Sequence, residues 1–86
     1  MKVLMKTVDM ICLSTSEGAI TPLKFRFKEG DQSTTIRIDR IIERKEEKLA
    51  GNRMLVFTVQ STLNGIERVF EMKYEIQSLK WYLYKL

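Results

Sequence analysis

The dipeptide Asn64-Gly65 constrains this chain more than any other feature, because alternating apolar and polar residues flank it on both sides. Two-residue Asn-Gly loops favour a type I′ turn, whose backbone twist matches that of the strands it joins. The turn therefore predicts a β-hairpin over residues 54–76 and fixes its register, with Val59 opposite Phe70. The chain is predicted to be a β protein.

The two faces of this hairpin differ in polarity. The apolar face consists of the pairs Leu63 with Ile66, Val59 with Phe70, Phe57 with Met72 and Leu55 with Tyr74. The other face consists of the pairs Thr62 with Glu67, Thr58 with Glu71 and Val56 with Lys73, and it is predicted to face water. A slip of one residue would exchange the two faces, so turn chemistry and hydrophobic pattern indicate the same register.

The same criteria predict four further strands outside this hairpin. These strands cover Met5 to Ser14, Leu23 to Phe27, Thr34 to Ile42 and Leu79 to Leu86. Pro22 cannot donate a ladder hydrogen bond, so we expect it near the start of a strand or at an edge. Two adjacent isoleucines, Ile41 and Ile42, interrupt the alternation and predict a β-bulge.

The most highly charged stretch of the chain is Glu43 to Arg53. It is predicted to be a loop with at most one short helical turn, near Glu46–Ala50. Gly51 follows this segment at the position where a glycine commonly ends a helix. A single turn of this length is not stable by itself, so the predicted fold class is all-β.

A chain of 86 residues is expected to form one domain, 1–86, around one thin core. The six predicted strands follow one another as an antiparallel meander. An open sheet of this size exposes two edges with unpaired backbone groups, and closure into a barrel removes them. We therefore expect a small six-stranded barrel, either SH3-like or OB-like.

Composition argues against several classes of function. The chain has no histidine and a single cysteine, Cys12, so an internal disulfide is excluded and neither a zinc or haem site nor any other cofactor is expected. Cys12 lies in an apolar strand, where a buried thiol is inert. Without histidine the usual ingredients of a catalytic site are missing, so the protein is predicted not to be an enzyme. No export signal or apolar stretch of about 20 residues is present, which favours the cytoplasm and no membrane association.

A basic strand face is the first candidate binding surface. Lys24, Arg26 and Lys28 alternate with apolar residues, and Arg37 follows on the next predicted strand. If the two strands are neighbours, these four side chains form a stripe that contacts phosphates. The alternative is a solvated outer face in a chain of net charge +4.

The last predicted strand carries a second candidate surface. Trp81 and Leu83 point to one side, where they would complete the core, while Lys80, Tyr82 and Tyr84 point to the other. Tyrosines on an open face stack on bases or anchor a protein partner. The alternative is that the N-terminal segment covers this face.

Several segments carry a resemblance to known sequences. These segments are Pro22–Phe27, Ile36–Ile41, Glu47–Met54, Arg68–Tyr74 and Trp81–Leu83. They resemble small uncharacterised proteins of anaerobic Gram-positive bacteria. They are also similar to a domain of unknown function associated with lesion-bypass DNA polymerases, although that domain is richer in tryptophan and this chain has only Trp81. The resemblance implies an accessory role in DNA transactions and assigns no functional residue.

Two functional hypotheses follow from these patterns. The first is a non-catalytic small binding module, an accessory protein-interaction subunit whose partner contacts the terminal strand or the charged loop. The second is direct, weakly sequence-specific nucleic-acid binding by the basic stripe with Tyr82 or Tyr84 stacking on bases. A homodimer formed by pairing of edge strands is compatible with both.

Overall fold

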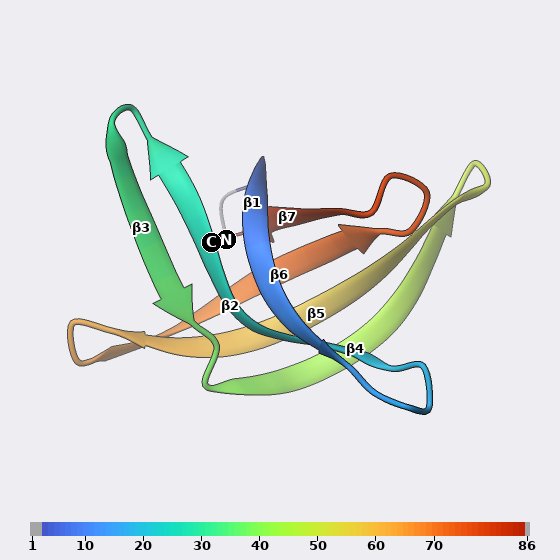
Figure 1. Ribbon diagram of the computed structural model, residues 1–86, viewed down its shortest axis with the longest axis horizontal. Helices are drawn as coiled ribbons and strands as arrows, with labels where there is room; N and C mark the ends of the chain where they lie inside the picture. The colour runs from blue at the N-terminus through green and yellow to red at the C-terminus, as the bar shows by residue number, and fades with distance from the viewer. Residues whose placement is uncertain (1–2, 86) are drawn as a thin grey trace.

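The computed structural model describes residues 3–85 and consists of β-strands joined by short turns (Figure 1). The strands are β1 (Val3–Ser14), β2 (Ile20–Glu29), β3 (Gln32–Arg37), β4 (Arg40–Leu49), β5 (Asn52–Leu63), β6 (Ile66–Glu75) and β7 (Lys80–Lys85). All neighbouring strands pair antiparallel, and no helix occurs within residues 3–85. The all-β prediction is confirmed; the end of the predicted last strand, Leu86, lies outside the described residues.

The strands form a single seven-stranded sheet in the order β3-β2-β1-β7-β6-β5-β4. The first and last strands of the chain, β1 and β7, are therefore neighbours in the middle of the sheet, whereas β3 and β4 occupy its two edges. In Figure 1 these two edge strands diverge from the short link that joins them.

The prediction of a closed six-stranded barrel is wrong in both respects. The segment Thr34 to Ile42, expected as one strand, contains the end of β3, the start of β4 and the link Ile38-Asp39 between them. Ile38 N donates to Leu23 O at 2.8 Å, and Asp39 N donates to Gln60 O at 2.8 Å. Because two consecutive residues bond to opposite ends of the sheet, β3 and β4 separate instead of pairing, and the sheet stays open.

The central hairpin has the register that the sequence predicts. β5 and β6 pair from Leu63 opposite Ile66 to Met54 opposite Glu75, and Asn64 and Gly65 have φ values of 52° and 78°. Positive φ at both turn positions is the signature of a type I′ turn.

Most of the charged segment, Glu43 to Leu49, belongs to the edge strand β4, where a loop was predicted, and it contains no helical turn. Leu49 pairs with Asn52, so Ala50-Gly51 is a two-residue hairpin loop with φ values of 51° and 83°. β5 offers its second edge to this segment, and a complete ladder of backbone hydrogen bonds outweighs one isolated helical turn. The predicted bulge is confirmed, because the register of the β4–β5 pair shifts between Ile41 and Glu43.

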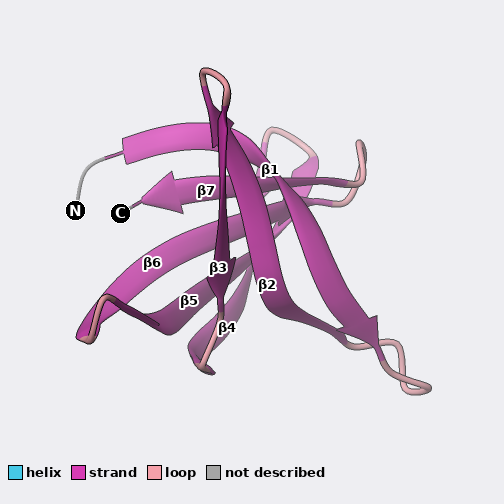
Figure 2. Ribbon diagram, turned by 60° about the vertical axis from the view of Figure 1, so that its left-hand side comes forward, coloured by secondary structure: helices cyan, strands magenta, loops and turns pink. Residues whose placement is uncertain are grey.

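The sheet is strongly curved (Figure 2), and its concave face holds the core. The buried residues of this core are Phe25, Ile36, Ile38, Phe57, Val59, Phe70, Met72, Trp81 and Leu83. Trp81 and Leu83 therefore complete the core as predicted, with the Trp81 ring 5.4 Å from that of Phe57. Pro22 is buried near the start of β2, as expected for a residue without an N–H. It lies beyond the last β2–β3 pair and opposite Cys12, where the register of the β1–β2 pair shifts.

The outer face of the hairpin is less exposed to solvent than predicted. Val56 and Lys73, which face each other there, are only 1% and 6% exposed. β4 and β7 flank the hairpin on its two sides. The Lys73 ammonium donates to Glu47 Oε1 at 3.0 Å and lies 3.8 Å from the centre of the Tyr84 ring.

Candidate functional site

The four cations of the predicted stripe lie together on the outer face of β2 and β3. Lys24 pairs with Arg37, Arg26 with Thr35 and Lys28 with Ser33. Strand alternation places all of these side chains on the face opposite Phe25 and Ile36, and each of the four cations is exposed. The predicted neighbourhood of the two strands is thus present in the structure.

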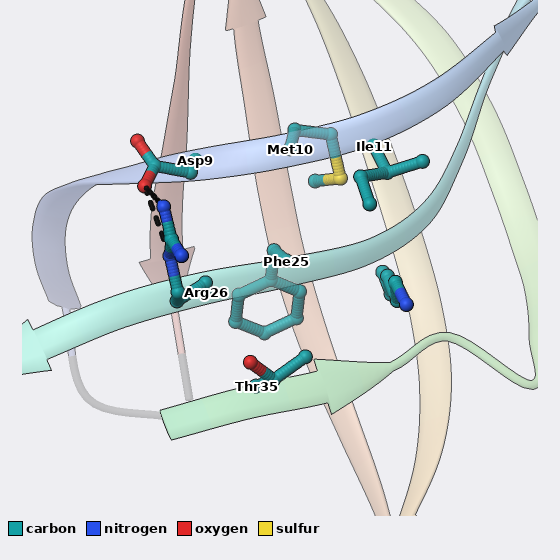
Figure 3. A pocket seen from close by; sticks show the side chains of 7 residues that line it. Asp9, Met10, Ile11, Phe25, Arg26 and Thr35 are labelled. Atoms are coloured by element: carbon teal, nitrogen blue, oxygen red, sulfur yellow. Dashed lines mark hydrogen bonds and ion pairs between the residues drawn. The ribbon is translucent and has the colours of Figure 1, made fainter. Parts of the chain in front are cut away.

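One cation of this stripe is already neutralised. Arg26 donates from both Nε and Nη2 to Asp9 Oδ2, at 3.2 and 2.8 Å (Figure 3). Asp9 belongs to β1, directly opposite Arg26 in the ladder. Arg26 is therefore less free to bind a ligand than the other three cations.

Lys24 and Arg37 form a pair of like charges. Ile38 N donates to Leu23 O, so Lys24 and Arg37, which lie between these two groups, are a non-hydrogen-bonded pair. Side chains of such pairs approach most closely, and like charges there are destabilising. Within residues 3–85, Lys24, Lys28 and Arg37 have no carboxylate at ion-pairing distance. This part of the stripe is an electropositive surface with no internal counterion.

The second candidate surface is on the outer face of β7, where one of its two tyrosines, Tyr84, is engaged by lysines. Lys80 is exposed, whereas Tyr82 and Tyr84 are half-buried. Two ammonium groups lie near the Tyr84 ring, Lys73 Nζ at 3.8 Å and Lys85 Nζ at 5.3 Å from its centre. β1 and β6 flank β7 on both sides, so this face is the middle of the sheet. A ring held by cations in this way is not an open stacking platform.

The charged edge strand β4 is organised by ion pairs with neighbouring strands. Arg53 Nε donates to Glu46 Oε1 at 2.7 Å, and this hydrogen bond lowers the pKa of the Glu46 carboxyl. The pKa of Glu75 on β6 is also lowered, first by the hydroxyl of Ser78 and then by the Asn52 amide, which donates to Glu75 Oε2 at 2.8 Å. The Arg53–Glu46 contact ties β4 to β5 at the sheet edge, whereas the Glu75 contacts lie outside β4.

The free edge of β3 is a surface that the sequence did not reveal. Since Lys24 and Arg37 are a non-hydrogen-bonded pair, the next pair, Phe25 with Ile36, exchanges both backbone hydrogen bonds. The pattern alternates along β3, so the N–H and C=O groups of Ser33 and Thr35 point away from β2. No described strand pairs with that side of β3. The available signal was the uncharged run Ser33 to Thr35, because protected edges carry charge or proline.

An apolar pocket of about 310 Å³ lies on the concave side of β3. Its lining comes from three parts of the sheet and consists of Phe27, Thr34, Ile36, Leu63, Asn64, Ile66, Arg68, Phe70 and Leu83. Ile66, beside the hairpin turn, is 58% exposed. The pocket therefore opens to solvent next to the unpaired edge of β3.

Cys12 is exposed, which contradicts the predicted buried thiol. The register of the β1–β2 pair shifts between Ile11 and Cys12, and every residue from Ile11 to Ser14 is exposed. Within the described residues, no three side chains of His, Cys, Asp or Glu are grouped so as to hold a metal ion. Residues 3–85 also contain no helix long and apolar enough to cross a membrane.

Comparison with known proteins identifies no relative: no family model, no curated protein and no solved structure matches this chain.

Proposed function

We propose that this protein is a non-catalytic binding module, an accessory protein-interaction subunit that holds its partner along the open edge of its sheet. The observation that supports this most strongly is the unpaired edge of β3, where Ser33 and Thr35 direct backbone donors and acceptors outward. Such an edge is a template for a strand from another chain. The neighbouring pocket supplies the apolar contact area that backbone hydrogen bonds alone do not provide.

Site-specific photo-crosslinking in the source cell tests this proposal. A photoreactive amino acid replaces Ser33 on β3, and in a control protein it replaces Thr62, an exposed residue of β5. We expect one dominant protein adduct from position 33 and none of that adduct from position 62. Equal labelling from the two positions, or no protein adduct from position 33, contradicts the proposal.

Direct nucleic-acid binding is a second candidate, and one observation favours it. Lys24 and Arg37 stand side by side without a carboxylate partner in residues 3–85, so a bound phosphate would relieve their repulsion. This reading agrees with the accessory role in DNA transactions that the sequence resemblance implies.

Fluorescence anisotropy of labelled single-stranded DNA and RNA at several salt concentrations tests the second candidate. The informative variant is Lys24→Gln with Arg37→Gln, because a change at Arg26 would also break its ion pair with Asp9. The control is Lys45→Gln with Lys48→Gln, which removes two positive charges from β4 instead of from the stripe. If the stripe binds phosphates, the first variant alone lowers the slope of log K against log salt by about 1.4. Absence of binding at low salt excludes this function.

A further inference from the structure

We infer that the partner segment is an extended acidic peptide that pairs with the free edge of β3, with acidic side chains on the outer face and apolar side chains over the concave pocket. This inference rests on the proposed function and specifies the chemistry of its partner.

Backbone geometry fixes which groups the peptide would bond. Ser33 and Thr35 each offer one N–H and one C=O toward the free side of β3. A strand laid along this edge therefore gains four backbone hydrogen bonds from these two residues without disturbing the β2–β3 ladder. Thr34, which lies between these two residues, bonds to β2 and offers none.

Side-chain alternation fixes the sequence pattern of the peptide. A peptide residue opposite Ser33, Thr35 or Arg37 shares the outer face with the cations of β2. Lys24, Lys28 and Arg37 have no carboxylate partner within residues 3–85, so acidic side chains at those positions meet unneutralised charge. A peptide residue opposite Thr34 or Ile36 lies on the concave face beside the pocket, where an apolar side chain fits. The complementary strand alternates acidic and apolar residues.

Charge also argues against a second copy of this chain as the occupant. Pairing of β3 with the β3 of another copy would bring together two faces that each carry Lys24, Arg26, Lys28 and Arg37. Of these four cations, only Arg26 has a carboxylate partner within the described part of the chain, so the two faces repel each other. A nucleic acid would neutralise these cations, but it has no strand-like donors and acceptors for the β3 edge and no apolar side chains for the pocket.

The test uses a synthetic peptide in which glutamate and valine alternate, titrated by calorimetry and by amide hydrogen exchange. The control peptide has the same composition, with all glutamates preceding all valines. We expect the alternating peptide to bind at least tenfold more tightly than the control. It should also slow amide exchange at Ser33 and Thr35 while leaving Thr34 unchanged, because the Thr34 amide is already bonded to β2.

A matched pair of variants tests the edge itself. Thr35→Pro removes an outward N–H, and proline is tolerated where a strand's N–H faces solvent. Thr35→Val keeps that N–H. We expect Thr35→Pro to weaken peptide binding at least tenfold and Thr35→Val to change it less than threefold, with both variants showing the cooperative thermal unfolding of the parent.

Other results overturn the inference. Equal affinity for the two peptides, or unchanged binding by Thr35→Pro, shows that β3 does not pair with an acidic strand. A dimer that dissociates on Thr35→Pro substitution identifies a second copy as the occupant, and oligonucleotide binding without peptide binding identifies nucleic acid. If the Ser33 crosslink forms but the peptide does not bind, the proposed function stands and the inferred partner chemistry is wrong.

Discussion

Lys73 shows how one residue can reverse its expected role. Lysine on the outer face of a hairpin is usually a solubilising residue, yet here its side chain is 8% exposed. The ammonium is satisfied by the Glu47 carboxylate at 3.0 Å and by the face of Tyr84. The Lys73 stem lies opposite Val56, so a charged side chain contributes apolar contact area.

This arrangement predicts an asymmetry between two substitutions. Glu47→Gln leaves a mostly buried ammonium without its carboxylate, and we expect it to lower the free energy of unfolding by about 1–3 kcal/mol. Lys73→Met keeps the apolar stem and removes the charge, so we expect a smaller loss. Urea unfolding of both variants measures the difference. A larger loss for Lys73→Met would contradict this reasoning, because it would show that removing the ammonium costs more than leaving it without its carboxylate.

At the scale of elements, the two edge strands differ in how they are protected. β4 carries an unbroken run of charged residues from Glu43 to Lys48. If two copies of β4 paired about a twofold axis, the residue on the axis would face the same residue of the other copy. Every residue in this run is charged, so any such register within it brings two like charges together. β3 has only serine and threonine at the corresponding positions, Ser33 to Thr35. Self-pairing is opposed at β4, whereas β3 is open to a complementary strand.

The turn between β4 and β5 makes a prediction about stability. Ala50 has a φ of 51°, in a left-handed region that costs a residue with a Cβ about 1–2 kcal/mol. Asparagine tolerates this conformation and is preferred at the first position of a type I′ turn. We expect Ala50→Asn to raise the free energy of unfolding by about 0.5–1 kcal/mol.

Thermal unfolding measures this gain, and Ala19→Asn is the control because Ala19 is an exposed turn residue without positive φ. We expect the control to change stability by less than about 0.5 kcal/mol. A gain of the same size at both positions would contradict an origin in turn strain.

At the scale of the whole molecule, one side chain ties the two ends of the open sheet together. Arg44 of β4 donates to Ile20 O at 2.8 Å and to Thr21 Oγ1 at 2.7 Å, and both of these acceptors belong to β2. Its guanidinium also lies 5.3 Å from the centre of the Phe57 ring. The curvature that encloses the core is thus held by a contact between strands that do not pair.

We expect Arg44→Lys to lower the free energy of unfolding by about 0.5–1.5 kcal/mol, because lysine lacks the fork that reaches two acceptors. Amide hydrogen exchange near Thr21 should become faster, since this end of β2 loses its tie to β4. Lys45→Gln, on the opposite face of β4, is the control and should leave both measurements nearly unchanged. Unaltered exchange at Thr21 in Arg44→Lys would show that pairing with β1 alone holds this end.

Local chemistry in the sequence determined the hairpin. Asn64-Gly65 and the alternation around it specify turn type, register and the residues that face the core, because all three depend on residues close in the chain. The same reasoning places the cations of β2 on one face and puts Trp81 in the core. The Ala50-Gly51 turn escaped prediction because alanine rarely adopts positive φ, so its sequence does not signal a turn.

The tertiary structure decided whether the sheet closes. That outcome depends on Ile38 bonding to β2 and Asp39 bonding to β5, a long-range choice that alternation within Thr34 to Ile42 does not encode. The burial of Lys73, the neutralisation of Arg26 by Asp9 and the outward backbone groups of Ser33 and Thr35 all follow from which strands become neighbours. The sequence by itself therefore determined the hairpin, the face of β2 that carries the cations and the core position of Trp81. The tertiary structure decided which edge remains free to bind, because an edge exists only once every strand has found its partners.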